Sequence, residues 1–186
     1  MSDFGGATHG NVDFIERPEL TTRRLLLRRP NDGDVDRIVK IVGDWEVARR
    51  LVRVPHPYGS TDAKFFLEQV VPSEWVWAIT LQGSKDLLGV AGLTPAEGAD
   101  TAELGYWLSR DHWGQGIVTE AARAVVSCGF DTLNLPYITS GYFEENPASG
   151  RVLEKLGFVE TGRARRPCLA TGTDVPSVEM RLSRSA

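Results

Sequence analysis

The sequence predicts an α/β (α+β) fold in which about four helices flank a mixed, mostly antiparallel sheet of six to seven strands. Strand-like segments joined by short turns occupy residues 74–109 and predict an antiparallel meander. After Gly116 the apolar positions change to a helical period of about 3.6 residues. Residues 137–143 then read as a strand, and the order strand, helix, strand makes a right-handed crossover that places it parallel to residues 101–109. The sheet therefore combines antiparallel strands with a parallel pair.

Composition sets the broad class of the protein. The chain has 186 residues, of which 41% are hydrophobic and 25% charged, as in an ordinary globular domain with a sizeable core. A formal net charge of -4 argues against non-specific nucleic-acid binding. Cys128 and Cys168 have neither metal-ligand nor disulfide-framework spacing, so we expect no metal. The chain has no run of about 18 apolar residues and no secretory signal, so we expect a cytoplasmic protein without a membrane partner.

We expect one domain over residues 21–186, preceded by a flexible, polar segment over residues 1–20. No internal repeat or linker interrupts residues 22–184. The predicted strands are residues 22–29, 74–81, 87–94, 101–109, 137–143, 158–166 and 175–184. Helical periodicity or capping residues mark residues 35–42, a short segment at 46–51, and residues 61–70, 118–128 and 147–156.

A proline-rich loop, residues 54–59, joins two of the predicted helices. Pro55 and Pro57 exclude regular structure there. Helices joined in this way are suited to forming a movable wall over a cleft, but the loop is equally consistent with a solvent-facing connector.

The segment with Gly114 and Gly116 joins a predicted strand to a predicted helix and has the features of a phosphate site. Glycines let a ligand approach the main chain closely. The first amides of a helix lack internal partners and lie at the positive end of its dipole. The alternative is a plain connection. Two common nucleotide motifs do not fit, because the dinucleotide fingerprint needs a glycine where Thr119 stands and the chain has no Gly-Lys-Ser/Thr.

The last predicted helix has clear ends, with Asn146 as its N-cap, Pro147 in the first turn and Gly157 at its end. With this helix in place, an ordered set of motifs resembles the GNAT superfamily of acetyl-CoA-dependent N-acetyltransferases, in particular the ribosomal-protein N-terminal (alanine/serine) acetyltransferase branch. The resemblance covers residues 22–184. Its motifs are Thr22 to Arg28, Pro57-Tyr58, Glu103 to Trp107, Trp113 to Gly116, and Asn146 to Ser149 followed by Val152 to Phe158.

The resemblance implies the GNAT fold, with the sheet split between strands four and five. It also implies direct transfer of an acetyl group from the thioester of acetyl-CoA to a primary amine. Trp113 and Val118 stand where the family has Gln/Arg and Gly/Ala, which removes a side-chain contact but leaves the amides. The implied cofactor-binding residues are Trp107, Leu108, Ser109, Trp113, Gly114, Gln115, Gly116, Ile117, Val118, Asn146 and Ser149.

Two residues are candidates for catalysis. Glu103 is the only acid on its predicted strand and is a candidate base for the amine; the alternative is an ion pair at the strand end. Ser149 matches the serine that the family places near the CoA sulfur, although it also fits a local hydrogen bond. Tyr142 is an alternative donor. Some relatives are thought to use a glutamate near the position of Cys168, which has no acid here, and weaker candidates are Glu144 and Glu145.

Two other functions remain open from the sequence: a catalytically inactive CoA-binding regulatory module, and a nucleotide-binding regulator. The acceptor is either a protein N-terminus or a small-molecule amine, and the oligomeric state is either monomer or homodimer. The basic cluster Arg163, Arg165 and Arg166 fits either an acidic substrate or, more simply, a solvated strand face.

Overall fold

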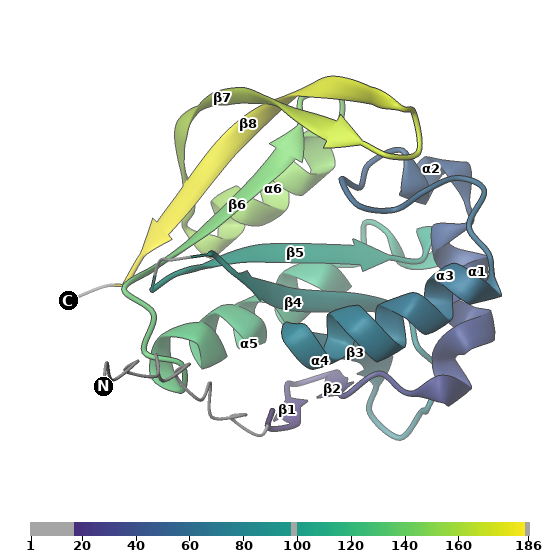
Figure 1. Cartoon of the computed structure of the whole chain (residues 1–186). Coiled ribbons are helices and arrows are strands. Elements are labelled where there is room, and N and C mark those ends of the chain that lie inside the picture. Colours follow the sequence, from purple (N-terminus) through teal and green to yellow (C-terminus); the bar gives the residue numbers. More distant parts are fainter. Residues whose placement is uncertain (1–16, 98–99, 185–186) are drawn as a thin grey trace, which may run out of the picture.

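The structure is a computed structural model that describes residues 17–97 and 100–184. Its strands form a single eight-stranded sheet in the order β1-β2-β3-β4-β5-β6-β8-β7 (Figure 1). The predicted mixed, mostly antiparallel sheet is confirmed, with one strand more than predicted. The strands are β1 (Leu20–Thr21), β2 (Leu25–Arg28), β3 (Trp75–Leu81), β4 (Gly89–Pro95), β5 (Ala102–Leu108), β6 (Tyr137–Phe143), β7 (Val159–Cys168) and β8 (Thr173–Ser183).

Helices cover both faces of this sheet. A π-helical segment, Phe66–Val70, joins α3 to α4, so the predicted helix at residues 61–70 continues further than expected. The other helices agree with the predicted positions to within a few residues. The helices are α1 (Val35–Val42), α2 (Trp45–Ala48), α3 (Ser60–Phe65), α4 (Val71–Ser73), α5 (Ile117–Asp131) and α6 (Pro147–Leu156).

The additional strand, β1, lies in the segment predicted to be flexible. It pairs with β2, and just before it the Pro18 carbonyl accepts a 2.9 Å hydrogen bond from the Trp77 indole. Arg17 also donates to the Pro72 carbonyl at 3.2 Å. The packed domain therefore begins before residue 21. Residues 1–16 of the predicted flexible segment lie outside the described residues.

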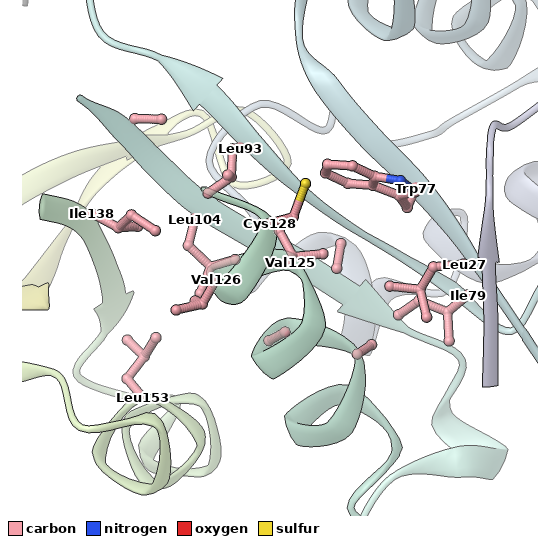
Figure 2. Close-up of a cluster of buried hydrophobic side chains, with 14 of the residues drawn as sticks. Leu27, Trp77, Ile79, Leu93, Leu104, Val125, Val126, Cys128, Ile138 and Leu153 are labelled. Carbon is pink, nitrogen blue, oxygen red and sulfur yellow. The ribbon is translucent and has the colours of Figure 1, made fainter. Parts of the chain in front are cut away.

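The two faces of the sheet have separate cores. On one face, α5 and α6 pack on side chains such as Leu93, Leu104 and Ile138, with Cys128 of α5 among them (Figure 2). On the other face, α1, α3 and α4 pack on side chains of β3 and β4. Burial on both sides explains why β3 alternates less than expected: Val76, Ala78 and Thr80 are buried as well as Trp77 and Ile79.

Strands β5 and β6 diverge soon after they pair. Their parallel register contains only Ala102 with Ile138 and Glu103 with Thr139. Where the strands separate, the Ser140 hydroxyl donates to the Leu104 carbonyl at 2.9 Å. Figure 1 shows the two strands spreading apart toward their carboxyl ends. Because β5 and β6 are the fourth and fifth predicted strands, the predicted split is confirmed.

Candidate functional site

A cleft of about 920 Å³ opens at the split. Its walls come from the edges of β5 and β6, the glycine loop before α5, the start of α6 and the segment between α2 and α3. Val54, Pro55 and Tyr58 line it, so the proline-rich loop is a wall of the cleft rather than a plain connector. Elements far apart in sequence thus meet around one cavity, as expected for a ligand site.

The glycine loop presents unpaired main-chain amides to this cleft. Gly114 and Gly116 have positive φ angles of 73° and 72°, which favour glycine. Within the described residues, the amides from Gly114 to Val118 donate to no other group, and helical bonding begins with Glu120 N to Gly116 O at 3.1 Å. These amides lie at the N-terminus of a 15-residue helix, α5. The loop can therefore bind an anion through its backbone.

Trp113, at the start of this loop, is already engaged. Its amide donates to the Arg110 carbonyl at 3.0 Å, and its indole nitrogen donates to the Leu108 carbonyl at 2.8 Å. Its side chain lines the cleft and is 40% exposed. Trp113 therefore offers a contact surface to a ligand rather than the amide that the sequence predicted.

The amino-terminal hairpin holds the glycine loop from outside. The Arg24 guanidinium donates to the Gln115 carbonyl at 3.0 Å and to Glu120 of α5 at 2.6 Å. Thr22 donates to the same carboxylate at 2.7 Å. Burial alone would raise the pKa of Glu120, but the hydrogen bonds from Thr22 and Arg24 outweigh it and lower the pKa. Glu120 thus remains ionised and fixes the loop to the sheet.

The edge of β5 offers further main-chain groups. The Leu104 and Leu108 carbonyls accept bonds on the side of the split. Because backbone groups alternate in direction along a strand, the N–H and C=O of Tyr106 face the same side. Ser109 differs from the prediction: its amide donates to Leu88 O at 2.8 Å and its carbonyl accepts from His112 N at 3.0 Å. The main chain of Ser109 is therefore turned away from the cleft.

Ser149 faces the split from the first turn of α6. As predicted, Asn146 caps this helix, its side-chain oxygen accepting from Ser149 N at 3.4 Å. The Ser149 hydroxyl lies 2.8 Å from the Tyr106 hydroxyl, so a neutral hydrogen bond connects α6 to β5 across the split. Burial raises the pKa of Tyr106 to about 12, despite the opposing hydrogen bond from Ser149. Tyr106 is therefore a neutral phenol at physiological pH.

Glu103 lies on the opposite face of β5. It alternates with Leu104 and faces the same side as Trp107, which packs in the core of α1 and α3. Its carboxylate forms an ion pair with Arg166 of β7, and its side chain is 43% exposed. Arg166 also binds Glu179 of β8 through two nitrogens. The strand-end ion pair considered from the sequence is thus present, and Glu103 also lines the cleft.

A second charged group borders this end of the cleft. Arg53 pairs with Glu74 at 2.6 Å, and the Thr94 hydroxyl donates to the same carboxylate at 2.8 Å. The hydrogen bond that Arg53 donates to Glu74 raises the pKa of Arg53, and the charge of Glu103 nearby adds to this effect. Glu74 and Glu103 thus each lie beside a guanidinium group, Arg53 and Arg166 respectively.

Of the remaining sequence candidates, Tyr142 and Glu145 line the cleft, whereas Glu144 and Cys168 do not. Glu144 pairs with Arg163 at 2.9 Å, and the Glu145 side chain is 79% exposed. Tyr142 packs against α6, where a Cβ at Gly150 would lie 2.7 Å from its ring. Cys168 is buried and has no acid at its position. Of the predicted cofactor-binding residues, Ser109 and Gln115 do not line the cleft. The nine that do are Trp107, Leu108, Trp113, Gly114, Gly116, Ile117, Val118, Asn146 and Ser149.

Three residues of the site were missed or misjudged from the sequence. Arg166 was expected on a solvated strand face, but its side chain is only 19% exposed. Glu179 was overlooked, although it is an acid flanked by the buried residues Val178 and Met180. Tyr106 was treated only as part of a motif.

In residues 17–97 and 100–184 no helix is long and apolar enough to cross a bilayer, and no group of acidic, histidine and cysteine side chains could hold a metal ion.

The sequence profile described as "Acetyltransferase (GNAT) domain" matches residues 24–159. An uncharacterized N-acetyltransferase of Bacillus subtilis, YoaA, is 31% identical over 169 residues, covering 84% of this chain and 91% of that protein. The ribosomal-protein-serine acetyltransferase of Escherichia coli is 33% identical over 78 residues, covering 41% of this chain and 44% of that protein.

The fold is also that of solved acetyltransferases. A GNAT-family acetyltransferase from Bacillus anthracis superposes with a TM-score of 0.79 at 21% identity, covering 89% of this chain and 98% of that one. The family profile spans β2 to β6, including the two strands on either side of the split, together with the glycine loop and α6. The chain therefore belongs to the GNAT family of acetyltransferases.

Proposed function

We propose that the protein transfers the acetyl group of acetyl-CoA directly to a primary amine, on a protein N-terminus or a small molecule. The observation that supports this most is the meeting of three groups in one cleft: the unpaired amides from Gly114 to Val118, the free edge of β5, and the Ser149 hydroxyl. They match the pyrophosphate, the pantetheine arm and the sulfur of one extended cosubstrate.

The pyrophosphate of acetyl-CoA would rest on the loop amides at the positive end of α5. The pantetheine arm would lie along β5, where the main-chain groups of Tyr106 and Leu108 face the split. The side-chain nitrogen of Asn146, Nδ2, which makes no hydrogen bond within the described residues, would contact the same arm. This arrangement holds the thioester between β5 and α6 and leaves the opposite face for the acceptor.

The reaction begins when the neutral amine attacks the thioester carbon. The amine loses a proton to Glu103, directly or through water, and the Tyr106 N–H stabilises the oxyanion of the tetrahedral intermediate. The carbon–sulfur bond then breaks, giving an amide and the CoA thiolate. Ser149, oriented by Tyr106, donates a hydrogen bond to that thiolate, which takes a proton from solvent and leaves as the thiol, while Glu103 returns its proton to solvent.

Thiol release from acetyl-CoA, measured against a panel of small amines and short peptides, tests this function. We expect turnover with at least one acceptor and an acetylated product in the mass spectrum. Tight acetyl-CoA binding without turnover on any amine would instead support the inactive CoA-binding module, which is favoured by the engagement of Glu103 with Arg166.

A binding experiment tests the cofactor separately. We expect acetyl-CoA and CoA to raise the melting temperature, and ATP and NAD to leave it unchanged; the reverse would support a nucleotide-binding regulator. Gly116→Ala should weaken acetyl-CoA binding, because alanine at φ 72° is strained and distorts the loop. Gly83→Ala, at φ 78° in a turn away from the cleft, is the matched control and should bind normally.

We further propose that the protein is cytoplasmic, uses no metal, binds neither nucleic acid nor membrane, and exists as a monomer or homodimer. The net charge of -4 supports the absence of nucleic-acid binding. Thiol release that persists in the presence of a chelator would support the absence of a metal. Light scattering of the purified protein would determine the oligomeric state.

A further inference from the structure

Arg166 crosses the sheet from one side of the split to the other. It projects from β7, and its Nε and Nη2 donate to Glu179 on the neighbouring β8. Its Nη1 reaches Glu103 on β5. Because the strand order is β5-β6-β8-β7, the guanidinium must pass over β6 to make this contact. A single side chain thus connects the two halves of the split sheet.

Gly141 of β6 makes this crossing possible. It pairs with Glu179 in the β6–β8 register, directly beneath the guanidinium. A Cβ at this position would lie 2.9 Å from Arg166 Cζ, which is too close for the present arrangement. The absence of a side chain at residue 141 therefore lets the arginine lie flat against the strand.

The Glu103 carboxylate is held by one oxygen only. Oε1 accepts from Arg166, and the described residues provide no hydrogen bond to Oε2. Glu103 lines the cleft and lies where β5 and β6 separate. The charged groups around it are Arg166 of β7, Glu179 of β8, and the Arg53–Glu74 pair, so its second oxygen remains available to a ligand.

We propose that Arg166 is a positioning residue, which holds the Glu103 carboxylate at the narrow end of the split so that its second oxygen meets the acceptor amine. This inference rests on the proposed function. A glutamate on a strand samples several rotamers, and an arginine anchored on Glu179 restricts it to one. Small displacements of a reacting group cost large factors in rate, so this restriction should be visible in kcat.

Two other roles for Arg166 make different predictions. If its guanidinium obstructed the acceptor, then removing it would increase turnover. If it only tied the two halves of the sheet together, then removing it would lower stability, and its effect on rate would not depend on Glu103.

Steady-state kinetics of Arg166→Gln, with the acceptor that the wild-type protein uses best, tests the proposal. We expect kcat to fall about tenfold, within the range for a misplaced acid or base, while KM for acetyl-CoA stays unchanged. Arg166→Lys should recover part of the loss. Gly141→Ala should also reduce kcat, because it displaces the guanidinium while the arginine is still present. Arg163→Gln is the matched control, because Arg163 is an exposed, ion-paired arginine of β7 outside the cleft, and should behave as wild type.

The decisive variant combines Arg166→Gln with Glu103→Gln. If Arg166 acts through Glu103, the double variant should be no slower than Glu103→Gln alone. If the kcat losses of the two single variants multiply in the double variant, or if kcat increases in Arg166→Gln, the proposal is overturned while the acetyltransferase function stands. Absence of turnover by the wild-type protein on any amine would overturn the proposed function, and this inference with it.

Discussion

Besides the Ser140–Leu104 hydrogen bond, two side-chain bridges cross the split in the sheet, and these two bridges differ in chemistry. On the face of α5 and α6, Tyr106 and Ser149 share a neutral hydrogen bond of 2.8 Å. On the face of α1 and α3, Glu103, Arg166 and Glu179 form a charged network, to which the Ser177 hydroxyl adds a 3.2 Å hydrogen bond to Glu179. The first lies beside the start of α6 and the second lies where β5 and β6 separate.

This difference matches the two proton movements of amide formation. A departing thiolate needs a hydrogen-bond donor, which a phenol–hydroxyl pair supplies without a fixed charge. An entering amine needs an acceptor for its proton, which a carboxylate supplies. If the proposed function is correct, the two faces of the split sheet divide these tasks, and variants on each face should fail in different ways.

The largest effect is expected from the charged face. Glu103→Gln keeps the size of the side chain and one carbonyl oxygen but removes the proton acceptor, so kcat/KM for the amine should fall about 100-fold. Acetyl-CoA affinity, measured by calorimetry, should remain near the wild-type value. The control is Glu144→Gln, which alters an acid that pairs with Arg163 outside the cleft. If Glu103→Gln is as active as wild type, the Glu103 carboxylate takes no part in proton transfer.

The neutral face should give a smaller effect of a different form. Ser149→Ala and Tyr106→Phe each remove one hydroxyl of the pair, and we expect each to lower kcat about tenfold, the value of one hydrogen bond lost from the transition state. Because the hydroxyls act together, the double variant should be little slower than either single variant. Additive losses would show that Tyr106 and Ser149 act separately.

Local sequence chemistry was enough to predict the parts of the site built within one segment. Asn146, Pro147 and Gly157 gave the bounds of α6, and Gly114 with Gly116 gave the loop before α5. In each case the residues that specify the conformation lie beside the group that they position. The split itself came from the family resemblance.

The two bridges could not be predicted in this way. Tyr106 and Ser149 are 43 positions apart, and Glu103 and Arg166 are 63 positions apart. The charged contact depends on β8 lying between β6 and β7, an order that the periodicity of the strands does not determine. It also depends on Gly141, whose lack of a side chain matters only once Arg166 lies over it.

The neutral bridge should also be detectable in alkaline stability. Burial raises the pKa of Tyr106 to about 12, above the value of about 10 in the unfolded chain. Its contribution is therefore complete below pH ~10 and is lost as the pH rises toward ~12, by at most about 1.4 kcal/mol per pH unit. Tyr106→Phe should lose stability less steeply than wild type between pH ~10 and ~12 in urea unfolding.

Tyr58 provides the comparison for this measurement, because burial also raises its pKa to about 12. Tyr58→Phe should reduce the loss of stability with rising pH by a similar amount, because this loss reports the burial of a tyrosine. It should leave the Tyr106–Ser149 hydrogen bond in place. Parallel curves for wild type and Tyr106→Phe would mean that Tyr106 ionises as easily in the folded protein as in the unfolded chain.

The charged bridge should show the opposite pH dependence and the smallest effect. The hydrogen bond from Arg166 lowers the pKa of Glu179 despite partial burial, so this group stabilises the fold above its unfolded pKa of about 4.3. The contribution is lost as the pH falls below that value. With 28% of the side chain exposed, solvent screening limits it to about 1 kcal/mol or less. Glu179→Gln should therefore be less stable than wild type at pH ~7 and should match it more closely at pH ~3. An equal difference at both pH values would show that Glu179 acts through packing rather than charge, and the charged contact of Arg166 would then be mainly that with Glu103.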